Sequence, residues 1–295
     1  SCCHAMSVGT ASTAFRALPA AAPGASLRRM GESTATAPLD AASASALRDR
    51  WNSVRERVSA AAGRSGRKAS DVMLVVVTKS GSIDQIRELV NMGQVDLAEN
   101  RVQQLTQRAA TIGEWLSRRS EMDPKATVPQ VRWHMIGSLQ RNKVRKAMDV
   151  SRLVHSMDSL RLAEEMQAAA SRRPTPMEVL VEVNVSGEAS KSGIAPPAVR
   201  HMLDQMDTMV NLKVRGLMCM APLSGGQDEA RRTFERCKEL FDDCRRSGSG
   251  GDRFDILSMG MSGDFEVAIE CGANLVRVGG AVIGPPQVEE AADEA

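Results

Sequence analysis

The chain has 295 residues, of which 42% are hydrophobic, and a mean hydropathy of -0.24, values that suit a globular protein with a sizeable core. Its 38 lysine and arginine residues nearly balance 36 aspartate and glutamate residues, which leaves a net charge of +2. This balance argues against a dedicated nucleic-acid-binding or membrane-surface protein, and no apolar run approaches the ~20 residues that a membrane span needs.

The N-terminal segment, residues 1–38, is rich in alanine and serine. It contains Arg16, Arg28 and Arg29 and no acidic residue before Glu32. This composition is typical of an organelle transit segment, which would direct the protein to a mitochondrion or plastid. It equally suits the disordered tail of a cytoplasmic protein. Under both interpretations we expect no folded structure before residue 39 and a single intracellular domain over residues 39–295.

Residues 72–80 hold the most informative stretch of the chain. Apolar residues at helical spacing over residues 41–63 predict an extra helix before it. Residues 72–77 are all apolar, which predicts a strand buried on both faces, as in a parallel sheet covered by helices. Lys79 follows at the carboxyl end of this strand, where apolar surroundings of its stem would keep the amine nucleophilic, as Schiff-base chemistry requires. The alternative is a lysine that simply extends into solvent.

Seven further strands are expected to alternate with helices. Ser82 and Gln85 form a capping box that begins the helix after the first strand, and residues 117–129 are expected to form a loop. We expect the other strands at residues 95–98, 131–136, 152–156, 178–185, 212–218, 254–257 and 274–278. Eight strands alternating with helices over about 250 residues predict an α/β fold, a (β/α)₈ TIM barrel. A doubly wound open sheet is the alternative, because counting strands does not prove closure.

Two glycine-rich loops follow the seventh and eighth strands, where barrels of this kind often bind phosphate. The first covers residues 258–263 and includes Ser258 and Ser262, and the second contains Gly279 and Gly280. Unpaired backbone N–H groups at helix starts favour a dianion, and the Ser262 hydroxyl can donate to the same oxygens. Each residue taken alone fits an ordinary turn or N-cap, but together with Lys79 the loops predict a phosphate site.

Arg277 lies in the eighth strand between two valines, so alternation points it away from their face, into the barrel. A buried arginine needs an acceptor, and an aromatic ring nitrogen can serve only while unprotonated, because arginine keeps its proton. A strand carboxylate such as Glu182 is the alternative acceptor. An amine for an aldehyde, a phosphate cradle and a guanidinium for a pyridine nitrogen together describe a pyridoxal 5′-phosphate (PLP) site.

Several motifs extend this pattern over residues 72–284. They include Val77-Thr78-Lys79, Ala98-Glu99-Asn100-Arg101, Trp133-His134-Met135-Ile136-Gly137, Val183-Asn184-Val185-Ser186-Gly187, Gly216-Leu217-Met218 and residues 257–265. The combination resembles the pyridoxal phosphate homeostasis protein family. That resemblance implies a single barrel like the N-terminal domain of alanine racemase. It also implies cofactor-binding residues: Lys79 for the Schiff base, Arg277 for the pyridine nitrogen, Ser262, Gly279 and Gly280 for the phosphate, and Asn100 and Ser258 beside the cofactor.

The role that the resemblance implies is to bind PLP and pass it on, keeping the free aldehyde low, with no catalytic residues. PLP-dependent apoenzymes would be the partners, and we expect a monomer that contacts neither nucleic acid nor membrane. The six cysteines show no metal-ligand or redox-pair spacing, so we expect reduced thiols and no metal.

The sequence departs from the family pattern in three places. Gly81 stands where a second lysine commonly follows the Schiff-base lysine. Leu97-Ala98 replaces the usual Phe-Gly, and residues 283–286 replace the usual final Phe-Gly-x-Arg. A handover role for the residue at position 81 is therefore not expected here.

The main alternative is a PLP-dependent racemase or decarboxylase on the same barrel. Arginine opposite the pyridine nitrogen makes the ring a poor electron sink but does not exclude racemisation. Related racemases place a tyrosine opposite the lysine, whereas this chain has no tyrosine, and we expect no room after the last strand for their additional β domain. His134 and His155, at strand ends, are the candidate bases that remain. A Schiff-base aldolase acting on a sugar phosphate and a non-covalent phosphate-binding barrel are further alternatives.

Overall fold

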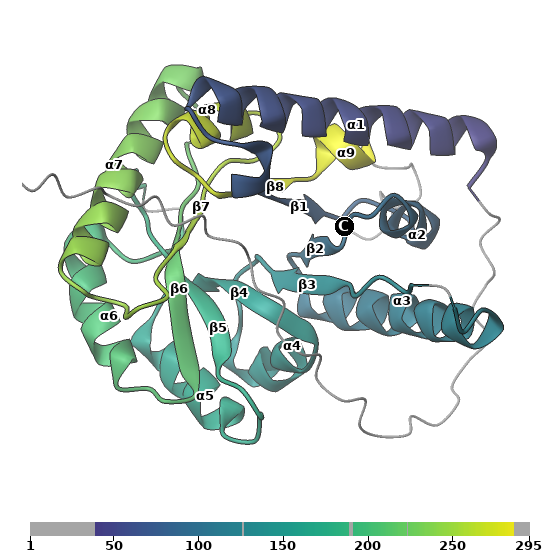
Figure 1. Cartoon of the computed structure of the whole chain (residues 1–295). Helices are drawn as coiled ribbons and strands as arrows, with labels where there is room; N and C mark the ends of the chain where they lie inside the picture. The colour runs from purple at the N-terminus through teal and green to yellow at the C-terminus, as the bar shows by residue number, and fades with distance from the viewer. Residues whose placement is uncertain (1–38, 126, 189–190, 223, 286–295) are drawn as a thin grey trace, which may run out of the picture. The chain divides into compact units, whose positions relative to one another are not determined.

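A computed structural model describes residues 39–125, 127–188, 191–222 and 224–285, so the predicted tail or transit segment, residues 1–38, lies outside the described residues. Eight parallel strands close into a barrel in chain order, with β1 paired to both β2 and β8 (Figure 1). The strands are β1 (Met73–Val77), β2 (Asp96–Glu99), β3 (Arg132–Met135), β4 (Ser151–Met157), β5 (Met177–Glu182), β6 (Leu212–Met218), β7 (Ile256–Ser258) and β8 (Leu275–Val278). The predicted (β/α)₈ barrel is confirmed, and the open sheet is excluded.

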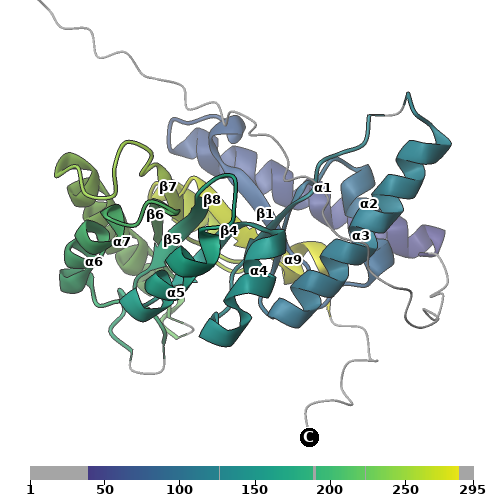
Figure 2. The same ribbon diagram turned by 90° about the horizontal axis from the view of Figure 1, so that it is seen from below.

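The helices lie around the outside of the barrel (Figures 1 and 2). They are α1 (Ala41–Arg64), α2 (Ile83–Asn91), α3 (Val102–Met122), α4 (Val144–Val150), α5 (Leu160–Ala170), α6 (Val199–Asp207), α7 (Gly226–Arg246), α8 (Phe265–Glu270) and α9 (Gly280–Ile283). Short 3₁₀ turns cover Ala69–Asp71, Arg141–Lys143 and Pro196–Ala198. The extra helix α1 buries Leu47, Trp51, Val54 and Val58 and packs on α8 and α9. The described helices include none with both the length and the apolar character needed to cross a bilayer.

The predicted start of α2 is confirmed, and the predicted end of α3 is wrong. The Ser82–Gln85 capping box is present, with Gln85 N donating to Ser82 Oγ at 3.2 Å. The expected loop over residues 117–129 is wrong in its first part, because α3 continues to Met122. Nothing before Pro124 prevents helical geometry, and proline disfavours it in the preceding residue, so the helix ends there.

Side chains of the strands alternate between two hydrophobic clusters. The cluster inside the barrel consists of Val75, Val77, Ala98, Leu153, Leu180, Met218, Ile256 and Leu275. The larger cluster fills the space between the strands and the helices. The close approach of β6 to β7 depends on Gly216, whose φ is +148° and where a Cβ would lie 1.7 Å from the Ile256 carbonyl oxygen. The interior cluster shows which residues of every strand except β3 face the barrel axis.

Candidate cofactor site at the mouth of the barrel

The register between β1 and β8 brings Lys79 and Arg277 to the same region. Val75 pairs with Arg277 and Val76 pairs with Val278. Because alternate residues share a face and Val75 lies in the interior cluster, Arg277 also lies on the inner face. Lys79 follows the carboxyl end of β1 by two residues, so it lies at the barrel mouth, on the carboxyl side of Arg277. The two residues predicted to bind opposite parts of one ligand therefore come from adjacent strands.

Lys79 lies in a turn just beyond β1 and is exposed, so the expectation that its stem is surrounded by apolar residues is wrong. The last buried residue of this segment is Thr78, directly before Lys79. Within the described ranges its amine makes no hydrogen bond or ion pair, which leaves it available to a ligand.

The turn that carries Lys79 is held from α3 by Arg108. Its Nη2 donates to the Gly81 carbonyl at 2.8 Å, and its Nη1 donates both to the Thr78 carbonyl and, at 2.5 Å, to Glu99 Oε1. Gly81 is buried, and a Cβ there would lie 3.1 Å from Ile283 Cδ1. Position 81 is therefore a packed part of the turn.

Arg277 is buried, with 3% of its surface exposed, and its side-chain hydrogen bonds to described residues go to neutral acceptors. Nη1 donates to Ser258 Oγ at 2.5 Å and Nη2 to the Cys219 carbonyl at 3.0 Å. It forms no ion pair with any carboxylate that the structure describes, so the alternative of a pair with Glu182 is not realised. Burial lowers the pKa of the guanidinium, but arginine remains protonated in proteins. The barrel interior therefore holds a desolvated guanidinium with N–H groups left to donate to a ligand.

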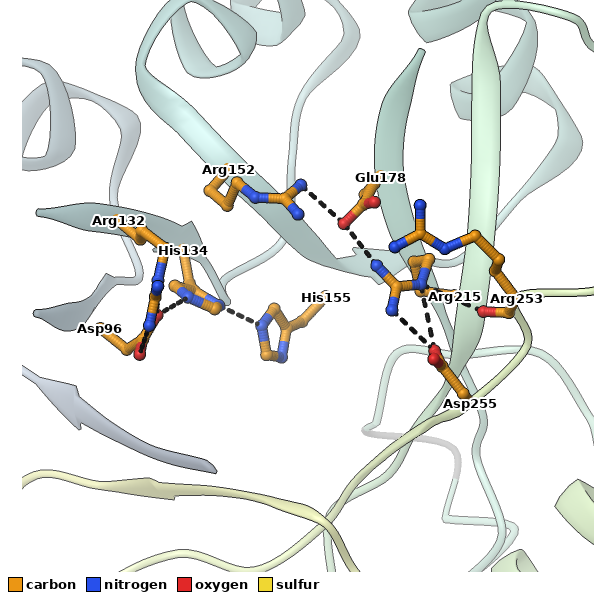
Figure 3. A network of polar contacts seen from close by, with 9 residues as sticks. All are labelled: Asp96, Arg132, His134, Arg152, His155, Glu178, Arg215, Arg253 and Asp255. Atoms are coloured by element: carbon orange, nitrogen blue, oxygen red, sulfur yellow. Dashed lines mark hydrogen bonds and ion pairs between the residues drawn. The ribbon is translucent and has the colours of Figure 1, made fainter. Parts of the chain in front are cut away.

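Arg215 shows what a paired arginine looks like in the same barrel. It is 2% exposed, and its Nη1 and Nη2 lie 2.8 Å from carboxylate oxygens of Glu178 and Asp255 (Figure 3). Burying a charge without such a partner is costly. The contrast indicates that Arg277 is reserved for a group that the chain itself does not supply.

The predicted phosphate loops meet, although not in the expected way. Ser262 Oγ accepts hydrogen bonds from the backbone N–H groups of Gly279 (3.2 Å) and Ala281 (3.3 Å). The expectation of unpaired N–H groups is therefore wrong for these two, because a hydroxyl oxygen lies within their reach. A Cβ on Gly280 would meet nothing within 4 Å, so space remains beside the loop. The two backbone donors hold the Ser262 oxygen in place, so its own O–H is the group that can donate to an anion in this space.

Asn100 follows β2 directly and has an unsatisfied side chain. Its Oδ1 is buried without a hydrogen-bond partner in the described part of the chain. Its backbone is fixed, because a Cβ on Gly137 would lie 2.1 Å from the Asn100 carbonyl oxygen. A buried carbonyl oxygen without a donor is costly, so a ligand hydroxyl or N–H group would stabilise it. The free amine, the unpaired guanidinium, the joined loops and this amide together fit PLP.

Comparison with known proteins supports this interpretation. The alanine racemase N-terminal domain family matches residues 43–286. A pyridoxal phosphate homeostasis protein of Aquifex aeolicus is 35% identical over 236 residues, which cover 80% of this chain and 96% of that protein. The chain belongs to the pyridoxal phosphate homeostasis protein family.

Two solved structures extend the comparison. An unknown protein from Bifidobacterium adolescentis has 35% identity and a TM-score of 0.76, covering 84% of this chain and 98% of its own. PipY of Synechococcus elongatus, solved with PLP bound, has 28% identity and a TM-score of 0.67, covering 81% of this chain and 100% of its own. Both structures therefore share the fold of this chain over more than four fifths of its length.

The two candidate bases, His134 and His155, lie inside the barrel and not at its mouth. His134 and His155 are 2% and 0% exposed and hydrogen-bond to each other inside the barrel. They lie near the carboxyl ends of β3 and β4, as expected, but burial and their mutual hydrogen bond keep both rings away from a substrate at the mouth. In the residues that the structure covers, no group of three or more His, Cys, Asp or Glu side chains is arranged to hold a metal.

Glu182 belongs to the site region, and sequence reasoning considered it only as an ion-pair partner. It is the last residue of β5 and 4% exposed, and alternation from Leu180 places it on the inner face. Burial and the nearby Asp158 carboxylate raise its pKa to about 7, although Arg277 acts in the opposite direction. Strand alternation in the sequence could have placed Glu182 on the inner face, because Glu178, Leu180 and Glu182 share one face of the predicted strand.

We expect Glu182→Gln to stabilise the cofactor-free protein above neutral pH. The folded state disfavours the ionised carboxylate, so stability is lost as pH rises from about 4.5 through about 7. A pKa of about 7 instead of 4.5 lowers the free energy of unfolding by about 3 kcal/mol at pH 8, and by much less at pH 5. Urea unfolding at both pH values measures this, with the exposed Glu164→Gln as control. An equal gain at both pH values would contradict the assignment.

Proposed function

We propose that this protein binds PLP as a Schiff base on Lys79 and serves intracellular PLP homeostasis and cofactor supply without catalysis of its own. The observation that carries the proposal is Arg277, a buried guanidinium without a carboxylate partner on the strand next to that of Lys79. A neutral pyridine nitrogen is the kind of acceptor it lacks. The names of the relatives and the PLP bound to PipY support the same choice.

Each part of the site would then have one task. When bound, the cofactor supplies an aldehyde that reacts reversibly with amines. The Lys79 amine would hold it covalently, while Arg277 donates to the ring nitrogen and keeps it unprotonated. The Ser262 hydroxyl would donate to the phosphate in the open space beside Gly280, while its oxygen accepts from the N–H groups of Gly279 and Ala281. Asn100 Oδ1 would accept a hydrogen bond from the ligand.

Two features favour a carrier over a racemase. The sequence contains no tyrosine, and both candidate histidines are buried and engaged within the barrel. Neither a tyrosine nor one of these two histidines is therefore placed as a second base opposite Lys79. We propose that the protein works inside the cell, as a monomer, and gives up PLP to dependent apoenzymes.

The test is to mix the purified protein with PLP, record its absorbance, and compare intact mass with and without borohydride reduction. We expect a yellow protein that gains one fixed cofactor on the peptide containing Lys79, and negligible turnover of L- or D-amino acids. A colourless protein with no mass gain would overturn the proposal, leaving a non-covalent phosphate-binding barrel or an aldolase. Rapid turnover that depends on Lys79 would instead identify a racemase or decarboxylase.

A further inference from the structure

A continuous series of hydrogen bonds crosses the barrel interior, beginning at the amino ends of β2 and β3. Asp96 Oδ1 and Oδ2 accept from Arg132 Nε and Nη2 at 2.7 and 2.5 Å. His134 Nε2 lies 3.3 Å from Asp96 Oδ1, and His134 Nδ1 lies 3.0 Å from His155 Nε2 (Figure 3). All of these side chains except that of Arg132 are more than nine-tenths buried.

The series continues from His155 to the cofactor site. His155 Nδ1 lies 3.1 Å from Ser258 Oγ, which accepts from Arg277 Nη1 at 2.5 Å. His155 and Ser258 are both fully buried, so water does not compete for these contacts. Asp96, His134, His155 and Ser258 are called the interior relay below.

The charge of Asp96 fixes the direction of every bond in the interior relay. Burial alone would raise its pKa, but hydrogen bonds from Arg132 and His134 hold that pKa at about 2, so the group is an ionised acceptor. His134 Nε2 therefore carries a proton and donates to it. Arg132 already supplies the countercharge, so a second buried cation at His134 would be unpaired, and neutral His134 presents Nδ1 as an acceptor.

His155 must then donate from Nε2. Burial, together with the positive charge of Arg277, lowers the pKa of His155 well below its ordinary value, so the ring is neutral and its Nδ1 is an acceptor. The Ser258 hydroxyl donates its only proton to that nitrogen, and its lone pairs face the guanidinium. Every donor in the interior relay thus points toward Asp96, and Ser258 can only accept from Arg277.

We propose that the interior relay is a one-way hydrogen-bond chain that positions the Arg277 guanidinium for an unprotonated ring nitrogen. The inference rests on the proposed function, because it assumes that Arg277 receives the ring of PLP. Ser258 and the Cys219 carbonyl hold one N–H on each terminal nitrogen, which leaves three of the five guanidinium donors for the ligand. Asp96, at the opposite end of the barrel, is a positioning residue for this site.

The first test uses the cofactor-free protein and needs no binding. Nitrogen-15 NMR of the imidazole rings is expected to show a protonated Nε2 and a pyridine-like, unprotonated Nδ1 for both His134 and His155 near neutral pH. A proton on His155 Nδ1 would mean that His155 donates to Ser258, which overturns the one-way relay.

The second test compares PLP with its 1-deaza analogue, in which a C–H group replaces the ring nitrogen. Wild-type protein is expected to prefer PLP, and Ser258→Ala and Asp96→Asn are each expected to reduce that preference roughly 10-fold, because a hydrogen bond to a charged group is lost or misaligned. Ser151→Ala is the matched control: a buried strand serine whose Oγ has no partner among the described side chains. Its ligand preference should be unchanged.

Comparing the two ligands distinguishes a loss of Arg277 positioning from a general loss of ligand binding. Relay variants that weaken PLP and its analogue equally would show a merely structural role and overturn the inference. If Asp96→Asn does not fold, Ser258→Ala still tests the inference. A wild-type protein that binds neither ligand would count against the proposed function, and the direction of the relay would still be decided by the histidine tautomers.

Discussion

Lys79→Ala is expected to abolish covalent attachment of PLP, so that borohydride reduction adds no mass to the protein. The remaining contacts from Arg277, Ser262 and the Gly279 loop are not covalent, so they would hold PLP only weakly and lose it on gel filtration. The yellow colour of the bound cofactor should disappear with the lysine, because only an amine at this position forms the Schiff base. Absorbance and intact mass measure both effects.

Lys143→Ala is the control for this substitution. Lys143 is an exposed lysine of the Arg141–Lys143 turn, so it samples the general reactivity of surface amines toward an aldehyde. We expect it to label like the wild type. If Lys79→Ala still gains one equivalent of reduced cofactor at a defined peptide, another lysine carries the Schiff base and the assignment is wrong.

Arg277→Leu is expected to weaken PLP binding and to stabilise the cofactor-free protein. Loss of a charged hydrogen bond to the ring should reduce affinity by about 10- to 100-fold. Removing an unpaired buried charge next to the interior hydrophobic cluster should raise the free energy of unfolding by about 1–3 kcal/mol. PLP titration and urea unfolding measure the two effects on the same preparation.

Arg215→Leu provides the comparison, because Arg215 is equally buried but paired with Glu178 and Asp255. Its removal leaves buried carboxylates without a partner, so we expect a loss of about 3–5 kcal/mol. If Arg277→Leu raises the free energy of unfolding and Arg215→Leu lowers it, the site holds an uncompensated charge that reduces the stability of the protein. A destabilised Arg277→Leu protein would show that the arginine supports the fold instead.

The amino-acid sequence alone predicted eight strands alternating with helices and the strand ends at which the candidate site residues lie, whereas closure of the barrel came from the structure. The apolar run before Lys79 and the glycines after the last strand mark strand ends, and parallel strands bring such ends to one edge. Periodicity also gave the inward direction of Arg277, because alternation is a local property of a strand. The capping box at Ser82 was correct for the same reason, since its hydrogen bonds lie within one turn.

Tertiary structure decided which groups are partners. Arg277 could have met Glu182 as readily as a ligand, and only the relative register of β8, β7 and β6 shows that it meets Ser258 and the Cys219 carbonyl instead. The interior relay likewise joins β2, β3, β4 and β7, whose spacing across the barrel no local pattern encodes. A sequence determines the face on which each side chain lies, whereas hydrogen bonds depend on ångström-scale distances that arise only when the barrel closes.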